Sequence, residues 1–155
     1  MTLPHIAIAS DHAGFEQKEL LSAWLSDQGF VVVDYGPFDD GRVDYPDFAS
    51  LVARAVGSGQ AELGVLVCGT GIGMAIAANK IAGVRAANLT SVEFAQLARE
   101  HNAANVATLS GRFIDVEENK QILSAWLNAT PEGGRHAERV AKIDALLIVT
   151  VVTGE

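Results

Sequence analysis

The chain has 155 residues, a formal net charge of −8 and a single cysteine. This length predicts one domain over residues 1–155 with one substantial core, and no apolar run approaches the roughly 20 residues that a membrane span needs. The negative charge argues against nonspecific binding to nucleic acids or anionic membranes. The lone cysteine excludes an internal disulfide. A single cysteine and an N-terminus that lacks the pattern of a secretory signal both suit a reducing cytoplasm.

The first half of the chain alternates between short apolar segments, which predict strands, and amphipathic segments, which predict helices. In chain order we expect a strand at 5–10, a helix at 14–29, a strand at 30–36, a loop at 36–46, a helix at 47–56 and a strand at 63–68. The first helix carries apolar residues at helical spacing, namely Phe15, Leu20, Leu21, Trp24 and Leu25. Gly29 suits its C-terminus, and Asp47 is expected near the N-terminus of the second helix.

The second half of the chain continues this alternation. It predicts a helix at 74–81, a strand at 84–89, a helix at 90–102, a strand at 105–110, a helix at 116–128 and a helix that begins near residue 133. Thr90 or Ser91 in front of Glu93 resembles the start of a capping box. After residue 145 the sequence becomes β-branched, and it fits either a strand or a docked tail.

Strands that alternate with helices predict an α/β fold, a doubly wound and mostly parallel sheet of five strands. In such sheets ligands bind beyond the carboxyl ends of the strands. The functional site is therefore expected at residues 10–12, 35–45 and 68–73, and at the ends of the later strands.

Three glycines at alternate positions, Gly69, Gly71 and Gly73, follow the strand at 63–68. Glycine permits unusual backbone angles and a close approach of ligand, and N–H groups at the start of the next helix favour negative charge. A Walker A loop is excluded because no Lys-Ser/Thr pair follows, and a dinucleotide motif is excluded because Met74 stands where it needs glycine. The loop is either a cradle for an anion or an enediolate, or a structural turn.

Two side chains in this segment could carry chemistry. Cys68 is either a small core residue or a thiolate favoured by the N-terminus of the next helix. Thr70 could hydrogen-bond a substrate oxygen or bond locally within the loop.

Polar side chains elsewhere also allow two interpretations. Asp11 and His12 could cap the following helix or hold sugar hydroxyls. Tyr45 could pack in a turn or line the pocket. His101, which precedes Asn102 at a helix end, could be a favourable C-terminal charge or a general acid–base group.

Three arginines are candidates for a phosphate clamp. Arg135 and Arg139 are four residues apart and share one helix face, and Arg112 follows the fifth predicted strand. Solvated surface is the default for arginine, but in an acidic protein such a set suits an anion.

Taken together, several motifs resemble the ribose-5-phosphate isomerase B family, which includes the galactose-6-phosphate isomerase subunits. They are SDHAGF, DYPDFA, CGTGIGMAIAANK, REHNAANV, GR at 111–112 and GGRHAERV, in order between about residues 5 and 145. The resemblance implies a Rossmann-like, three-layer α/β/α sandwich and a metal-free aldose–ketose isomerase without a cofactor. It also implies a homodimer or homotetramer with active sites between subunits, in whose contacts residues 133–155 take part.

The resemblance implies a role for each candidate residue. Cys68 is the base that moves a proton between C2 and C1 through a cis-enediolate, His101 aids ring opening, and Thr70 stabilises the enediolate oxygens. The implied substrate-binding residues are Asp11, His12, Tyr45, Gly69, Gly71, Ile72, Gly73 and Asn102, with Arg112, Arg135 and Arg139 on the phosphate. No group of potential metal ligands has a recognisable spacing in the sequence, so no metal site is expected.

One position distinguishes two branches of the family. Some members carry a glutamate base directly after the third glycine, where this chain has Met74, so the sequence resembles the cysteine-base branch. The expected substrate is ribose 5-phosphate or ribulose 5-phosphate. The alternatives are a tetrose 4-phosphate, allose 6-phosphate or galactose 6-phosphate, selected by the loop at 36–46 and Tyr45, or a non-catalytic phosphosugar-binding domain.

Overall fold

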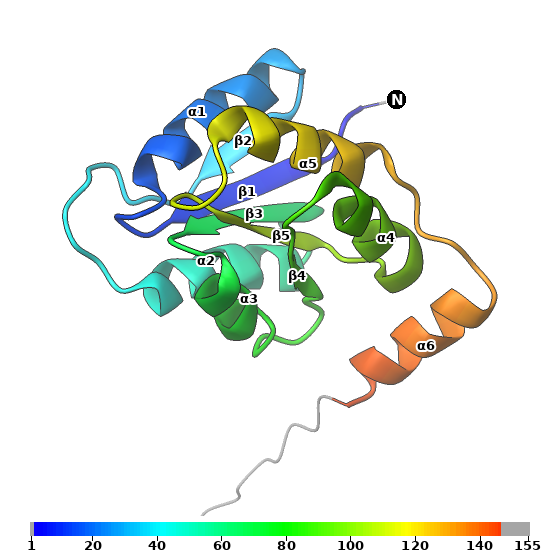
Figure 1. Cartoon of the computed structure of the whole chain (residues 1–155). Helices are drawn as coiled ribbons and strands as arrows, with labels where there is room; N and C mark the ends of the chain where they lie inside the picture. The colour runs from blue at the N-terminus through cyan, green and yellow to red at the C-terminus, as the bar shows by residue number, and fades with distance from the viewer. Residues whose placement is uncertain (1, 147–155) are drawn as a thin grey trace, which may run out of the picture.

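The computed structural model describes residues 2–146. Within this range strands and helices alternate until the last two helices (Figure 1). The elements are β1 (His5–Ser10), α1 (Phe15–Asp27), β2 (Val31–Asp34), α2 (Tyr45–Gly57), β3 (Leu63–Cys68), α3 (Ile72–Ala78), β4 (Ala86–Asn88), α4 (Val92–Asn102), β5 (Val106–Ser110), α5 (Val116–Asn128) and α6 (Arg135–Asp144).

The five strands form one sheet in the order β2-β1-β3-β5-β4. Every pair of neighbouring strands is parallel, so the predicted fold class is confirmed and the sheet is wholly rather than mostly parallel. The register sets Ser10 beside Val67 and Cys68 beside Ser110. The carboxyl ends of β1, β3 and β5 therefore lie level at one edge of the sheet.

Helices cover both faces of the sheet, as Figure 1 shows. Ile6 and Ile8 of β1 point into a core shared with α1, α4 and α5, whose largest side chain is Trp126. Ala7 and Ala9 point into the opposite core, which α2 and α3 complete. This alternation is the two-residue period of a strand buried on both faces, and it produces the three layers.

Element boundaries differ from the predicted ones where local backbone chemistry decides. Helix α3 begins at Ile72, two residues before the predicted start at residue 74, because Gly71 is its N-cap residue in a left-handed conformation. Ser91 caps α4 by accepting the N–H of Phe94 at 3.1 Å. Glu93 is then the second helical residue, so the predicted reciprocal capping box does not form. Leu20 is 47% exposed, outside the apolar face of α1.

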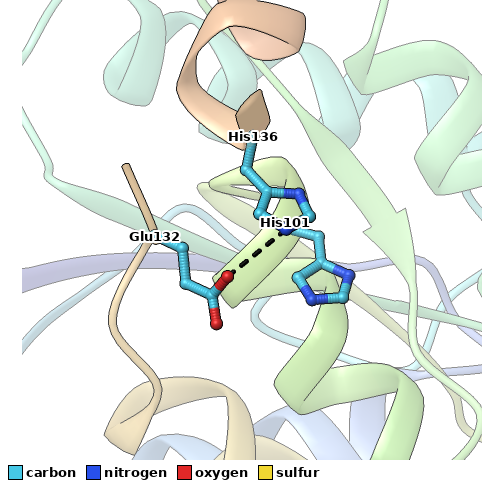
Figure 2. Close-up of side chains that lie close together, drawn as sticks. All are labelled: His101, Glu132 and His136. Atoms are coloured by element: carbon cyan, nitrogen blue, oxygen red, sulfur yellow. Dashed lines mark ion pairs between the residues drawn. The ribbon is translucent and has the colours of Figure 1, made fainter. Parts of the chain in front are cut away.

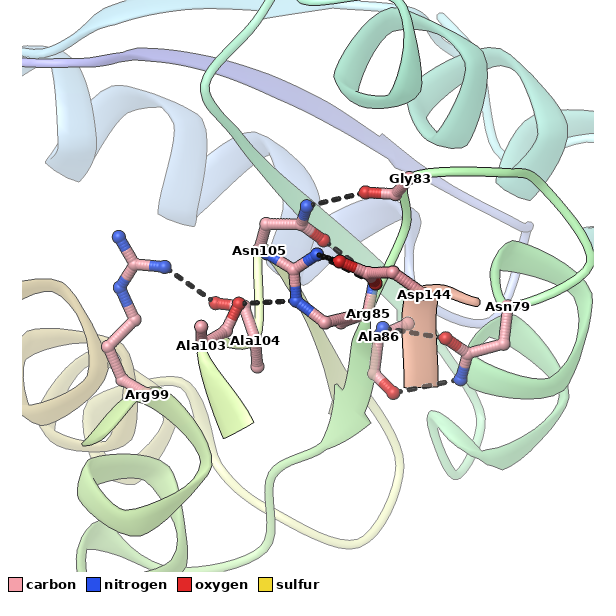
Figure 3. Close-up of polar contacts among 9 residues, drawn as sticks. All are labelled: Asn79, Gly83, Arg85, Ala86, Arg99, Ala103, Ala104, Asn105 and Asp144. Carbon is pink, nitrogen blue, oxygen red and sulfur yellow. Dashed lines mark hydrogen bonds and ion pairs between the residues drawn. The ribbon is translucent and has the colours of Figure 1, made fainter. Parts of the chain in front are cut away.

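Helix α6 packs beside α4 rather than on the sheet (Figure 1). Two anchors hold it. The backbone N–H of Glu132 donates to the carbonyl of Glu100 at 2.8 Å, and Arg85 Nη1 lies 3.1 Å from Asp144 Oδ1 (Figure 3). The predicted strand or docked tail after residue 145 falls almost wholly outside the described residues. Within the described range no helix is both long and apolar enough to span a bilayer.

Candidate active site

The site forms where three strands end side by side. The backbone N–H of Asp11, just after β1, donates to the carbonyl of Val67 at 3.1 Å, and the N–H of Gly111, just after β5, donates to that of Cys68 at 2.8 Å. From β1 the chain first adds β2 on one side and then returns to add β3 on the other side, so the strand order reverses between β1 and β3. Helix α1 packs on one face of the sheet and α2 on the opposite face. Ligands of open α/β sheets bind at such a crevice.

The glycine loop runs close to the neighbouring strands, and Gly71 makes this possible. Its φ is +82°, in the left-handed region that glycine favours. A Cβ at this position would overlap Asn88 Oδ1 and lie 3.0 Å from the backbone carbon of Leu109. A side chain here has no space, so the loop is held in one path.

Cys68 is packed in the core and also contacts the glycine loop. It is 4% exposed and belongs to the core cluster that includes Met74, yet its Sγ accepts the backbone N–H of Gly71 at 3.2 Å. The sulfur therefore faces the loop amides. Thr70 is exposed, and its Oγ1 accepts the N–H of Ile72 at 3.2 Å, which is the local bond expected of a loop threonine.

Tyr45 and Arg112 flank the loop from either side. A Cβ on Gly73 would lie 2.7 Å from Tyr45 Cζ, so the ring rests directly on the backbone of Gly73. A Cβ on Gly69 would lie 3.4 Å from Arg112 Nη1, which places the guanidinium beside the start of the loop. The aromatic ring and the positive charge thus lie at opposite ends of one cradle.

Sequence reasoning missed Ser110, which braces this cradle. Its hydroxyl donates to the carbonyl of Gly69 at 2.7 Å and accepts the N–H of Phe113 at 3.0 Å. Ser110 is the last residue of β5 and lies level with Cys68, and this position at a strand end is the feature that would have identified it.

Asp11 and His12 do not cap α1. Asp11 is 7% exposed, and its Oδ1 accepts the N–H of Gly14 at 3.0 Å, which closes the turn before the helix. His12 Nδ1 lies 3.3 Å from the backbone nitrogen of Val43 and 3.2 Å from its carbonyl oxygen, and so ties this turn to the loop that leads to Tyr45.

The remaining predicted residues lie elsewhere in the chain. His101 and Asn102 end α4, and because a crossover helix returns the chain toward the amino ends of the strands, they lie at the edge opposite Cys68. Asn102 lines a cavity of about 490 Å³ between β4, α4 and the end of α6. Arg135 and Arg139 are exposed on α6. Within one chain, the predicted site residues therefore form two groups at opposite edges of the sheet.

The second group contains residues that the sequence did not single out. The rings of His101 and His136 stack with centroids 4.1 Å apart and planes 5° apart, and His136 Nε2 lies 3.3 Å from Glu132 Oε2 (Figure 2). Burial lowers the pKa of His136, and the nearby His101 lowers it further, while the carboxylate of Glu132 opposes both. These residues meet because α6 folds back onto α4, which no sequence spacing shows.

Fold and site together define a parallel α/β domain with a thiol and a glycine cradle at the switch point of its sheet. The family model described as Ribose/Galactose Isomerase matches residues 6–143, so the chain belongs to the ribose/galactose isomerase family. The resemblance seen in the motifs is thereby confirmed, and the class of reaction is isomerisation of a sugar phosphate.

Three similar proteins span nearly the whole chain. Ribose-5-phosphate isomerase B of Escherichia coli is 46% identical, with 91% of this chain and 95% of that protein covered. A D-erythrulose-4-phosphate isomerase of Pectobacterium atrosepticum is 43% identical, with 89% and 91% covered. The crystal structure of ribose-5-phosphate isomerase B from Mycoplasma genitalium with bound ribulose-5-phosphate is 48% identical, with 92% and 95% covered and a TM-score of 0.89.

Proposed function

We propose that this protein interconverts ribose 5-phosphate and ribulose 5-phosphate, with Cys68 as the base. The observation that carries the proposal is the position of Cys68 Sγ, which faces the N–H of Gly71 inside the cradle at the switch point. A carbon acid beside a carbonyl needs one base and a set of donors where oxyanion charge develops. The thiolate and the amides of the loop supply both.

The proton movements balance without an additional reagent. The Cys68 thiolate takes the proton from C2 of the open-chain aldose, and the electron pair forms the C1–C2 double bond while charge moves onto O1. The O2 proton moves to O1, and the thiol then returns its proton to C1, which leaves the ketose carbonyl at C2. The amides around Gly71 and the hydroxyl of Thr70 stabilise the enediolate oxygens. The reaction belongs in the cytoplasm, where the thiol stays reduced.

Binding roles follow from what surrounds the cradle. Asp11, His12 and Tyr45 contact the sugar, and Arg112 beside Gly69 takes part of the phosphate charge. A phosphate held far from the reacting carbons supplies binding energy that fixes their geometry.

The other proposed residues serve the site of a second copy of the chain. His101 would open the sugar ring, Asn102 would bind a sugar oxygen, and Arg135 and Arg139 would hold the phosphate. Within one chain they lie at the other edge of the sheet from Cys68, and α6 is exposed along nearly its whole length. A homodimer, alone or within a tetramer, brings the two groups together.

Apolar side chains mark the surface that such a dimer would cover. They lie on the helices that precede and follow β4, which is an edge strand of the sheet. On α3 they are Ile72 and Ile76, 53% and 60% exposed, and on α4 Val92 and Phe94, 45% and 60% exposed. Exposed apolar groups around an unpaired edge favour a protein partner, and the incomplete site makes the partner a second copy.

A four-carbon substrate is the alternative that the comparisons favour, because one relative is named D-erythrulose-4-phosphate isomerase. The loop between β2 and α2 is largely exposed and joins the site through His12 and Tyr45. Its length and packing would decide how long a sugar fits. Values of kcat/KM for tetrose, pentose and hexose phosphates separate these cases.

The base is tested with Cys68→Ala. We expect this variant to lose most isomerisation and most deuterium uptake at C2 in D2O, while ligand-induced thermal stabilisation remains. Ser58→Ala, an exposed and distant serine, is the control and should keep full turnover. Unchanged turnover in Cys68→Ala removes the thiol from the mechanism. Substrate binding without proton exchange in the wild-type protein would indicate a phosphosugar-binding domain.

The shared site is tested by mixing two inactive variants, Cys68→Ala and His101→Asn. A mixed dimer holds one site with both substitutions and one with neither. Random reassociation should restore about a quarter of the wild-type activity if the site is built from two copies. No recovery after verified exchange of subunits would place all catalytic groups in one chain.

A further inference from the structure

A group of potential metal ligands lies outside the cradle. His101, Glu132 and His136 each place one ligand atom within 4.8 Å of the others, and within residues 2–146 they are the one group of three such residues that does so (Figure 2). His101 ends α4, Glu132 lies in the connector to α6, and His136 is in the first turn of α6. Two parts of the chain that are far apart in sequence, the end of α4 and the segment that leads into α6, therefore converge on one point.

The distances between the ligand atoms are close to those around a bound metal ion. Zn²⁺ bonds of 2.0–2.2 Å at tetrahedral angles place neighbouring ligand atoms about 3.3–3.6 Å apart. His136 Nε2 and Glu132 Oε2 already lie 3.3 Å apart. Since all three ligand atoms lie within 4.8 Å, His101 needs to move by no more than about 1.5 Å to complete the set. The two rings are parallel, so this movement must also tilt the His101 ring until its lone pair points between the other two atoms.

One backbone hydrogen bond and the burial of one imidazole hold this group together. The N–H of Glu132 donates to the carbonyl of Glu100 at 2.8 Å, which holds the connector beside the last turn of α4. His136 is 8% exposed, so packing against its neighbours limits the movement of its ring. His101 is only half-buried, and its side chain can rotate.

The ligand types select the ion. Two imidazoles and one carboxylate, with the fourth position left to water, are a common ligand set of Zn²⁺. Mg²⁺ and Ca²⁺ prefer oxygen ligands and do not suit a site with two imidazoles. Glu132 is 52% exposed, which leaves a path for an ion and its water from solvent.

We propose that His101, Glu132 and His136 form a binding site for Zn²⁺ or a similar borderline-soft divalent cation, and that occupation of this site inhibits the enzyme. Inhibition rests on the proposed function, because the bound ion takes the lone pair that His101 would use in ring opening. The binding site itself does not depend on the reaction. The ion would also link α4 to α6 and hold Arg135 in one position relative to His101.

Binding is measured on the full chain after treatment with a chelator and its removal. Calorimetric titration with ZnCl₂ should give one ion per chain, and CoCl₂ should give the visible absorption bands of a tetrahedral site. MgCl₂ should show no binding at the same concentrations. Glu132→Gln and His136→Ala should each weaken Zn²⁺ binding by at least about tenfold. His5→Ala, which removes an exposed histidine outside the group, is the matched control and should bind as the wild type does.

Inhibition is measured separately, on the isomerisation rate. Zn²⁺ should inhibit the wild-type enzyme reversibly, and Glu132→Gln should keep its basal rate but need at least about tenfold more Zn²⁺ for the same inhibition. Equal Zn²⁺ affinity in the wild type and both ligand variants would overturn the site. Zn²⁺ binding that depends on Glu132 and His136 but leaves the rate unchanged would overturn the inhibition. An inactive wild-type protein that still binds Zn²⁺ through this group would remove the proposed function and leave the site standing.

Discussion

Lys18 Nζ lies 2.7 Å from Asp34 Oδ2, and the lysine side chain is completely buried. The same ammonium donates to the carbonyl of Pro37 at 2.7 Å and lies 2.8 Å from Glu19 Oε1. The other oxygen of Asp34 accepts the N–H of Gly36 at 2.8 Å. This pair therefore fixes the start of the loop that continues to His12 and Tyr45 at the site.

Removing this ammonium should destabilise the fold strongly. Lys18→Met fills a similar volume but leaves the carboxylate of Asp34 and the carbonyl of Pro37 without their donor. We expect a loss of about 3 kcal/mol in the free energy of unfolding, measured in urea. Lys120→Met breaks a surface pair with Glu117 of the same length, 2.7 Å, and should cost less than about 0.5 kcal/mol. Equal losses in the two variants would show that burial adds nothing to the pair of Lys18.

The glycine loop offers a second comparison, between two glycines with almost the same backbone angle. Gly71 has φ +82° and Gly59 has φ +81°, but nothing lies within 4 Å of a Cβ built on Gly59. Gly59→Ala should therefore show the strain of the left-handed conformation alone, about 1–2 kcal/mol. Gly71→Ala should cost about 1–3 kcal/mol more, because its methyl group meets Asn88 and the backbone of Leu109.

This comparison also tests the cradle. Isomerase activity should fall sharply in Gly71→Ala and stay near the wild-type level in Gly59→Ala, as measured by kcat/KM. If both variants lose the same stability and keep activity, Asn88 moves aside freely and the path of the loop is not fixed by this contact.

The sequence could predict the cradle because it depends on local patterns and one topological rule. Short apolar segments identified the strands. The carboxyl ends of neighbouring parallel strands must meet, which brought Asp11, Cys68 and Arg112 to one edge. The burial of Lys18 was beyond the same reasoning, because helical periodicity treats lysine as a solvent-facing residue. It needs the positions of Asp34 and Pro37, which only the packed fold supplies.

The contacts of α6 were unpredictable for another reason. Its place is set by the path of the connector after α5 and by side chains on α4 and just before β4, which are far away in the sequence. The stack of His101 on His136 and the pair of Arg85 with Asp144 follow from that path alone. Spacing within the sequence carries no information about either contact.

The pair of Arg85 and Asp144 should control how firmly α6 is held (Figure 3). The two side chains are 21% and 46% exposed, so solvent screens the pair and its contribution to global stability is less than about 1 kcal/mol. Asp144→Asn should speed amide hydrogen exchange in α6 several-fold while β3 keeps its protection. High salt should produce the same change in the wild type and none in the variant. Unchanged exchange in the variant would show that other contacts of α6 suffice to hold it.

The contact between Tyr45 and Gly73 should couple the two sides of the cradle. A methyl group on Gly73 would lie 2.7 Å from Tyr45 Cζ and 2.8 Å from Cε2, so Gly73→Ala must push the ring away from the loop. We expect kcat/KM to fall at least about tenfold in Gly73→Ala. Relative to Tyr45→Ala, the double variant should lose less than about threefold in kcat/KM, because the obstructing ring is then absent.

Four proteins complete this cycle: the wild type, each single variant and the double variant. Tyr45→Phe is the added control, since it keeps the ring and its clash but lacks the hydroxyl. Its combination with Gly73→Ala should lose as large a factor as Gly73→Ala does alone. If Gly73→Ala has the same effect on kcat/KM with and without the Tyr45 ring, the methyl group acts on the loop amides and not through the ring. The close packing of Tyr45 on Gly73 would then have no part in positioning the substrate.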